Sequence, residues 1–368
     1  MSATPALPRW ADVAVLPLVN LAMALVVAGI VIAFIGQNPL DVLKLLVHGA
    51  FGTARGVSYT LYYATTFIFT GLAVAVATHG GLFNIGAEGQ ATLGGLGAGL
   101  VALWFSEALP GPLMLPLMVL AAAAFGAAWA AIPAYLQAYR GSHIVITTIM
   151  FNFLAYTLLV YLLVNVLKAP GSMAVESATF APSAFLPTMQ EALAPLGIEW
   201  PSSPLNLSLF LAIAAAVLVY VYLWRTRGGY RLRTVGANVG AAEYAGIRPA
   251  HQILIAMAIS GALAGFVAVN EIAGVNRRLL LDFVAGAGFT GIAVAIMGRN
   301  HPVGIVLASL LFGALFQGGA EVTFEMPGVS RDMVVTLQGF VILFSGAMAY
   351  VLAPALARLI HRDRKASG

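Results

Sequence analysis

The sequence predicts an all-α polytopic membrane protein, and three observations carry this prediction. Hydrophobic residues make up 61% of the 368 residues, charged residues make up 9%, and the mean hydropathy is +0.93. A soluble domain carries about 25% charged residues. Apolar segments long enough to span a bilayer recur along the chain, and basic residues gather between alternate segments. We therefore expect one transmembrane domain over 1–368.

About ten transmembrane helices are predicted from these apolar segments. They lie near 13–36, 57–79, 82–105, 113–136, 144–167, 207–224, 252–274, 284–298, 303–320 and 333–356. The third segment is rich in glycine, so a broken or re-entrant helix is an alternative to a regular span there. No convincing small-residue cleavage site follows the single early arginine, and we expect the first segment to be retained as a span.

The distribution of charge predicts that both termini are cytoplasmic. With this orientation, twelve of the 18 basic residues lie inside, as the positive-inside rule requires. The six outside are Lys44, Arg55, Lys168, Arg277, Arg278 and Arg331. Topology thus explains the pI of about 9.4, and no nucleic-acid partner is predicted.

A long polar stretch at 168–206 follows the fifth apolar segment. It contains six prolines, which favour an extended or turn-rich loop on the outer side with little regular structure of its own. This outer loop either tethers two parts of the bundle or offers a surface to an external partner.

A second polar stretch at 225–250 lies on the cytoplasmic side. Four arginines surround a Gly-Gly pair, after which Asn238 is predicted to cap a short helix that runs to Tyr244. Gly246 is suited to a left-handed stop before Pro249. Two helical turns are not stable alone in water, so this helix must pack against the rest of the subunit or against another protein.

Polar residues in the third apolar segment are the strongest candidates for function. An ionisable side chain inside a membrane is costly and is a functional-site candidate by default. Asn84 and Glu88 are four residues apart and share a helix face, and Gln90 follows. Gly95 and Gly99 are expected to admit a neighbouring helix. The structural alternative is that Asn84 and Glu88 satisfy hydrogen bonds between helices or cap a broken helix.

Conventional enzyme motifs are absent from the sequence. It has no cysteine, and none of its three lysines follows a glycine as a phosphate-binding loop requires. It also lacks the HExxH and GxSxG patterns, and its six histidines are scattered. We predict no catalytic residue, no metal site and no ATP hydrolysis by this chain.

Three motifs resemble a known family of transport proteins. They are GLFNIGAEGQ at 81–90, GSHIVITTIMFNFLA at 141–155 and RTVGANVGAAEYAGI at 233–247. They resemble permease subunits of bacterial ABC importers for nucleosides and simple sugars, in the branched-chain amino acid and ribose permease group. The resemblance covers about 40–350. It implies a type II ABC importer-like permease, multi-pass in the inner (cytoplasmic) membrane, that translocates a nucleoside or a related simple sugar.

The resemblance also implies partners. ABC ATPase subunits would bind the ATP and Mg²⁺ that this chain does not bind, a periplasmic or lipid-anchored binding protein would deliver the substrate, and a different, homologous chain would be the second permease. Membrane lipid would surround the assembly. The stretch 225–250 would be the cytoplasmic coupling loop that docks on the ATPase. Its implied contact residues are Arg231, Arg233, Gly236, Asn238, Gly240, Ala241, Ala242, Glu243 and Gly246.

Two details of this coupling loop stay open. Gly240 stands where many importers carry glutamate, which leaves the details of that contact undecided. Arg231 and Arg233 either pair with acidic groups of the ATPase or anionic lipid, or simply follow the positive-inside rule.

A polar pathway for the solute is predicted in the membrane. Its candidate residues are Asn84, Glu88, Gln90, Thr147, Thr148 and Asn152. Thr148 and Asn152 share a helix face, although threonine hydroxyls also bond back to their own helix. Few charges in the interior favour a neutral solute. The main alternative is an ion-coupled secondary transporter for a small polar solute, with Glu88 as the coupling acid; an intramembrane enzyme and a structural scaffold are further alternatives.

Overall fold

The computed structural model describes residues 16–34, 36–171, 173–326, 328–330, 333–336, 338–340 and 343–344. The chain divides into two compact units, a larger one of 57–313 and a smaller one drawn from 1–56 and 314–368. The described secondary structure is helical, apart from isolated bridges. Most of the predicted tenth span and the start of the first lie outside the described residues.

Six helices in the described part are long and apolar enough to cross a membrane. They are α3 (Ala54–His79), α5 (Gly111–Arg140), α6 (Ile144–Asn165), α8 (Ser208–Arg225), α11 (Pro249–Gly265) continued by the π-helix η5 (Val269–Asn276), and α13 (Pro302–Glu325). Helix α4 (Ala87–Phe105) and the shorter apolar helix α12 (Ala287–Met297) also belong to the larger unit. The protein is therefore an all-helical, multi-pass membrane protein.

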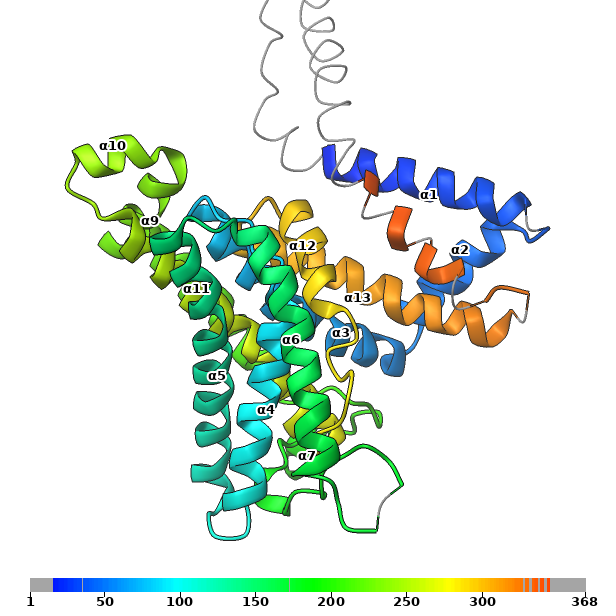
Figure 1. The fold of residues 1–368 in the computed structure, drawn as a ribbon. Coiled ribbons are helices and arrows are strands. Elements are labelled where there is room, and N and C mark those ends of the chain that lie inside the picture. Colours follow the sequence, from blue (N-terminus) through cyan, green and yellow to red (C-terminus); the bar gives the residue numbers. More distant parts are fainter. Residues whose placement is uncertain are drawn as a thin grey trace, which may run out of the picture. The chain divides into compact units, whose positions relative to one another are not determined.

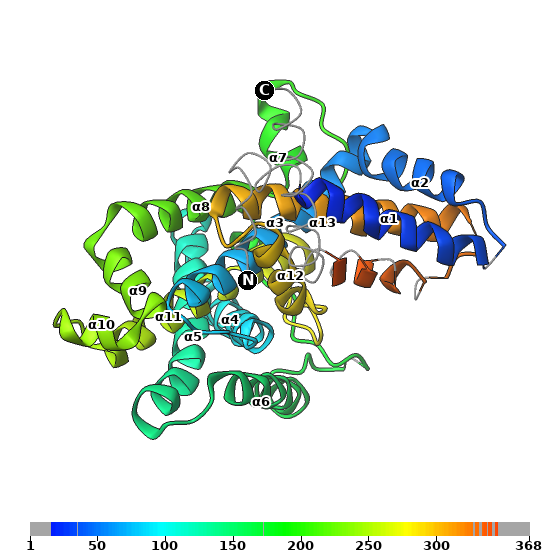
Figure 2. The ribbon, with the colours of Figure 1, turned by 90° about the horizontal axis from the view of Figure 1, so that it is seen from above.

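The buried helix α4 lies at the centre of the larger unit. It packs against α5, α6, α11 and α12, and Figures 1 and 2 show it among these helices. Glycines permit the close packing: a Cβ at Gly94 would overlap Gly265 of α11, and one at Gly126 of α5 would overlap Gly261. The backbones can approach because neither side carries a side chain at these crossings.

The prediction that Gly95 and Gly99 admit a neighbouring helix was wrong, because their close neighbours are side chains of a non-helical segment. A Cβ at Gly95 would overlap the ring of Phe283, and one at Gly99 would lie 3.2 Å from the Leu279 side chain. These glycines therefore admit two large side chains from the irregular segment after η5. The close helix contact is made one position earlier, by Gly94.

The Gly-rich third segment is a continuous helix from Ala87, and the non-helical connection before it is called the break below. Helix α3 ends at His79 and α4 begins at Ala87, so 80–86 is non-helical, with Gly81 at φ 76°. Leu82 and Asn84 are buried in this stretch. Helix α12 begins at Ala287, after a run of turns at 281–286 that includes the start of the predicted segment 284–298. Non-helical backbone at membrane depth is tolerated where protein buries it.

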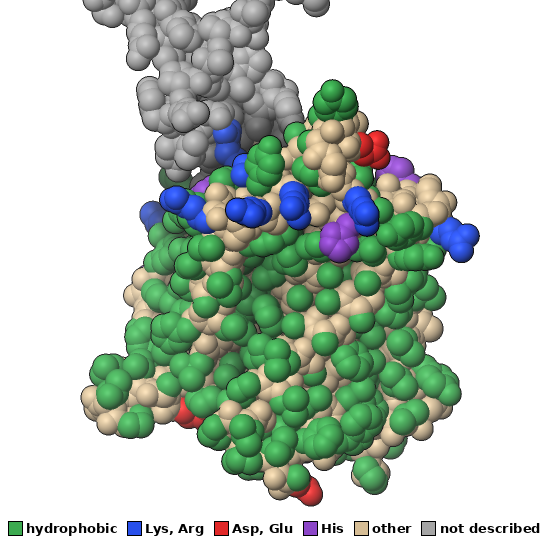
Figure 3. All heavy atoms as spheres, turned by 90° about the vertical axis from the view of Figure 1, so that its left-hand side faces the viewer, with side chains coloured by type: hydrophobic (Ala, Val, Ile, Leu, Met, Phe, Trp, Pro, Cys, Tyr) green, Lys and Arg blue, Asp and Glu red, His purple; other side chains and the backbone are tan. Residues whose placement is uncertain are grey.

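The second polar stretch, 225–250, folds into two helices. The predicted short helix is confirmed as α10 (Val239–Tyr244): Asn238 Oδ1 accepts a hydrogen bond from the Ala241 N–H at 3.0 Å, and Gly246 is left-handed at φ 75°. The sequence reasoning missed α9 (Arg227–Ala237), which Thr226 caps. Figure 3 shows basic side chains gathered at the end where α9 and α10 lie, above a broad hydrophobic surface. Exposed arginines at this end include Arg140, Arg225, Arg227 and Arg231.

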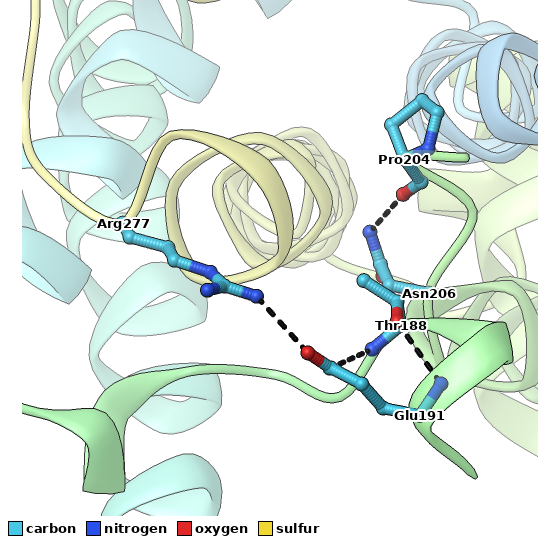
Figure 4. Close-up of polar contacts among 5 residues, drawn as sticks. All are labelled: Thr188, Glu191, Pro204, Asn206 and Arg277. Carbon is cyan, nitrogen blue, oxygen red and sulfur yellow. Dashed lines mark hydrogen bonds and ion pairs between the residues drawn. The ribbon is translucent and has the colours of Figure 1, made fainter. Parts of the chain in front are cut away.

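The polar stretch at 168–206 has short elements only, η3 (Pro182–Ala184), α7 (Met189–Leu193) and η4 (Ala194–Leu196), but it is folded against η5 and the segment that follows it. Leu186 N–H donates to the Ala273 carbonyl at 3.0 Å, and Phe180 N–H donates to the Arg277 carbonyl at 2.9 Å. The Glu191 carboxylate caps α7 and pairs with Arg277 at 3.5 Å, as Figure 4 shows. The loop is thereby fixed to the outer end of η5.

The smaller unit contains α1 (Leu16–Phe34), α2 (Pro39–Val47), the π-helix η2 (His48–Gly52) and the end of α13. Its core consists of Ile32, Val42, Val322, Val329 and Val334.

Candidate functional site

The break before α4 is held by an amide network. Asn84 Nδ2 donates to Gln90 Oε1 and to Ser260 Oγ, both at 2.9 Å, and Asn84 Oδ1 accepts from the Gly86 N–H at 2.8 Å. Ser260 Oγ in turn donates to the Ala73 carbonyl of α3 at 2.6 Å. Asn84 and Gln90 are buried, so their polar groups need these partners. The network ties α3, α4 and α11 together around the break.

Asn152 of α6 holds the other side of the break. Its Nδ2 donates to the Ile85 carbonyl and its Oδ1 accepts from the Gly89 N–H, both at 2.9 Å. Asn152 therefore caps the first turn of α4 from another helix. Thr148 is buried against Gly86, whose Cβ would lie 3.0 Å from the Thr148 Cβ, and its hydroxyl donates to the Ile144 carbonyl of its own helix at 2.8 Å.

Thr147 is separate from this group. Its hydroxyl donates to the His143 carbonyl of its own helix at 2.7 Å, on an exposed part of α6. The structure thus brings together Asn84, Gln90, Thr148 and Asn152, and it leaves Thr147 apart. The prediction that Asn84 and Glu88 share a helix face was wrong, because Asn84 lies in the non-helical stretch before α4 and the Glu88 carboxylate bonds a different element.

Glu88 occupies the N-terminus of α12. Its Oε1 accepts from the Gly286 N–H at 2.9 Å and its Oε2 accepts from the Gly288 N–H at 2.8 Å. A helix N-terminus carries a partial positive charge and free N–H groups, which stabilise a carboxylate. A Cβ at Gly288 would overlap the Glu88 backbone, so the contact requires glycine there. The N-terminal ends of α4 and α12 therefore meet at Glu88.

The sequence reasoning missed a second polar cluster in the larger unit. It consists of Tyr62, Thr66, Asn206, Ser208, Asn270 and Glu271. Tyr62 OH donates to Glu271 Oε2 at 2.5 Å, and Thr66 Oγ1 donates to Glu271 Oε1 at 2.9 Å. The signal that singled out Glu88, an acid inside an apolar segment, applies equally to Glu271 in 252–274. The two hydroxyl groups that bond its carboxylate lie more than 200 positions away in sequence and could not be assigned.

The chemistry of both clusters suits a neutral polar solute. They offer amide, hydroxyl and carboxylate groups, which make hydrogen bonds with uncharged hydroxyl and amide groups. In the described part of the chain, no group of three or more His, Asp or Glu side chains could hold a metal ion.

Helix α9 packs against the turn that leads to the amide network. Leu232 is buried beside Gly80, and a Cβ at Gly236 would overlap the His79 carbonyl. The helix that follows, α10, buries Ala242 but leaves Tyr244 99% exposed and Val239 51% exposed. The exposed side chains of α10 therefore lie next to α9 in sequence, and α9 packs on the turn that leads to the break.

Several helices long and apolar enough to cross a membrane here enclose amide, hydroxyl and carboxylate groups, and polar groups in this position mark solute pathways in transport proteins. The chain belongs to the family described as branched-chain amino acid transport system / permease component, which matches residues 56–346. This finding confirms the family resemblance noted in the sequence, and the chain is a permease of the ABC importer type.

Named relatives extend over nearly the whole chain. It is 36% identical to the glucose ABC transporter permease protein TsgB13 of Haloferax volcanii, over 89% of this chain and 86% of that protein. It is 34% identical to the guanosine ABC transporter permease protein NupP of Bacillus subtilis, over 93% and 95%. A second guanosine permease protein of that organism, NupQ, is 30% identical over 70% and 79%. No solved structure matches the chain.

Proposed function

We propose that this chain is the transmembrane permease subunit of an ATP-driven ABC importer for a nucleoside or a related simple sugar in the cytoplasmic membrane. The similarity to permeases named for glucose and for guanosine carries this proposal. Both solutes present a ring that is rich in hydroxyl groups, and the amide and hydroxyl side chains of the larger unit suit such a solute. The absence of a phosphate-binding loop is consistent with ATP hydrolysis on separate subunits.

The proposed topology has ten spans with both termini cytoplasmic, and 1–368 acts as one type II permease domain. The loop at 168–206 lies outside the membrane, and 225–250 lies in the cytoplasm. The basic end of the molecule supports this orientation, because Lys and Arg are enriched on the cytoplasmic side (Figure 3).

The proposed pathway passes the break before α4. Asn84, Glu88, Gln90, Thr148 and Asn152 hold the shape of this break, and small rearrangements there would expose amide and carboxylate groups to the solute. Thr147 is omitted from the proposal because its hydroxyl is bonded to its own helix away from the break.

The proposed coupling element is α9 with α10. The exposed residues of α10, which include Gly240, Ala241 and Glu243, would dock on the ATPase together with Gly246. Arg231 is exposed beside them, whereas Arg233 is half-buried and Ala242 is buried. Gly236, packed on the turn at His79, would pass a displacement of α10 to the break as a rigid-body motion.

The proposed partners are an ABC ATPase, a substrate-binding protein on the outer side, and a second, homologous permease. The occurrence of NupP and NupQ in one organism supports a pair of different permease chains. The folded outer loop would be the surface that the binding protein meets.

Uptake into proteoliposomes tests the function. The chain is reconstituted with the permease, ATPase and binding protein encoded beside it, and radiolabelled guanosine and glucose are supplied with and without ATP. Accumulation that requires both ATP and the binding protein is expected. Uptake by this chain alone, driven by an ion gradient, would instead establish the secondary-transporter alternative.

A matched pair of glycine variants tests the coupling element. Gly236→Ala places a methyl group against the His79 carbonyl, whereas Gly111→Ala adds one where the nearest atom is 3.5 Å away. The first variant is expected to lower the amount of solute carried per ATP hydrolysed, and the second is expected to leave it unchanged. Equal coupling in both variants would contradict the role of α9.

A further inference from the structure

Building on the proposed function, we propose that Glu271, with Tyr62 and Thr66, forms a recognition site within the permease for two adjacent hydroxyl groups of the solute. The binding protein would therefore not be the sole source of selectivity. The site lies in the second polar cluster, apart from the break at Glu88.

The Glu271 carboxylate has hydroxyl partners and no basic partner. The ion pairs of the described residues involve Asp41, Glu176 and Glu191. Glu271 instead accepts from the Tyr62 and Thr66 hydroxyls and, at 3.4 Å, from Asn270 Nδ2. An ionised carboxylate has about four acceptor positions. These three donors leave at least one acceptor position for a solute hydroxyl. A solute hydroxyl can also replace the Tyr62 or Thr66 hydroxyl, because it is a donor of the same kind.

Glu88 is less suited to this exchange. Both of its oxygens are bonded to backbone N–H groups at the start of α12. A solute hydroxyl that displaced one of them would leave a buried backbone donor without a partner, which is unfavourable. Glu271 would lose only a hydroxyl partner, which can rotate to bond the solute.

The cluster has a buried base and a more open side. Thr66 and Asn270 are buried, whereas Tyr62 and Glu271 are partly exposed. The Tyr62 ring, whose hydroxyl bonds the carboxylate, has its centroid 5.1 Å from that of the Tyr63 ring. A carboxylate that accepts from a ribose hydroxyl and an aromatic ring that stacks on a base are recurring elements of nucleoside recognition.

The base of the site is rigid. Asn270 Nδ2 donates to Thr66 Oγ1 at 2.8 Å, and Asn270 Oδ1 accepts from Asn206 Nδ2 and from Ser208 Oγ, both at 2.9 Å. Asn206 also donates to the Pro204 carbonyl at the end of the outer loop, as Figure 4 shows. Side chains held in this way preorganise a site, because binding then costs little conformational entropy.

Transport of paired substrates tests the proposal. ATP-dependent uptake of guanosine and of 2′,3′-dideoxyguanosine is measured with the complete importer, and the ratio of the two rates is compared between wild type and Glu271→Gln. The binding protein is the same in both, so its contribution to the ratio cancels. Loss of the hydrogen bond between the carboxyl group and a solute hydroxyl is expected to lower the preference for guanosine about tenfold, which corresponds to about 1.4 kcal/mol.

Thr66→Val and Thr70→Val form a matched pair on α3. Thr66 bonds Glu271, whereas the Thr70 hydroxyl donates to carbonyls of its own helix at 3.3 and 3.4 Å. The first variant is expected to reduce the preference several-fold, and the second is expected to keep the wild-type ratio. This pair decides the question if the Glu271 variant does not assemble.

The outcomes distinguish failure of the proposed transport function from failure of the proposed recognition site. A wild-type importer without ATP-dependent uptake of guanosine or glucose would refute the proposed function itself. If the wild type transports guanosine but the Glu271 and Thr66 variants keep its preference, or lose both substrates equally, the recognition site is refuted and the cluster is structural. If glucose is the solute, 2-deoxyglucose replaces the dideoxynucleoside.

Discussion

Replacing Glu88 with glutamine should detach the start of α12 from α4. The glutamine side chain keeps one acceptor oxygen, so only one of the two N–H groups, of Gly286 or Gly288, retains its partner. The other N–H would face the amide NH₂. Loss of a hydrogen bond to a charged group costs about 1.5–3 kcal/mol, and loss of the charge at a helix N-terminus costs about 0.3–1 kcal/mol. We expect a destabilisation of about 2–4 kcal/mol.

The assay combines thermal unfolding in detergent with transport. The unfolding midpoint of Glu88→Gln is expected to fall by several degrees, about 5 °C, relative to wild type. Glu107→Gln is the matched control, because Glu107 is exposed in the turn after α4. Its midpoint should not change. ATP-dependent uptake by Glu88→Gln should fall in part, because the break keeps its amide network.

An unchanged midpoint in Glu88→Gln would refute the reasoning, because the two backbone hydrogen bonds would then contribute nothing to stability. Complete loss of transport with an unchanged midpoint would indicate that Glu88 acts as a coupling acid. That result would favour ion-coupled transport.

Three other changes have defined outcomes. Asn152→Ala removes the bonds to Ile85 and Gly89 and should cost about 1–3 kcal/mol in thermal or denaturant unfolding; a wild-type unfolding curve would contradict the cap. Gly246→Val places a β-branched residue at φ 75° and should uncouple ATP hydrolysis from uptake. Normal assembly with the ATPase and normal transport by this variant would contradict the proposed docking role of the loop. A backbone hydrogen bond from Thr188 lowers the pKa of Glu191, so the outer loop should lose stability as the pH falls below about 4.5, and protease cleavage of this loop should lose that pH dependence in Glu191→Gln.

Local signals predicted the short cytoplasmic helix correctly. Asn238 and Gly246 act on neighbouring backbone groups, so sequence alone is sufficient to recognise them. The same reasoning failed for α9, because a Gly-Gly pair disfavours a helix. Packing overrides this preference: Gly229 lies against the backbone of Tyr222, where a side chain would not fit, and Leu232 is buried.

The candidate site was predicted in part. Polarity inside an apolar segment was sufficient to select Asn84, Glu88 and Gln90, and the shared helix face selected Asn152. The same polarity did not separate Thr147 from Thr148, because only the rotation of α6 decides which of two adjacent residues faces the break. Glu271 carried a comparable signal, but its meaning depended on Tyr62, which reaches it from α3.

The sequence by itself determined that this protein is a multi-pass membrane protein, because composition, hydropathy and charge placement accumulate along the chain and do not depend on how helices pack. Its motifs identified the permease family, and Asn238 and Gly246 marked the ends of the short helix α10. Only the tertiary structure decided which donors each buried carboxylate meets. Glu88 and Glu271 are equally costly in an apolar segment, yet one is bonded by the backbone of a helix N-terminus and the other by side-chain hydroxyls. That difference arises because hydrogen-bond partners are set by which helices lie side by side.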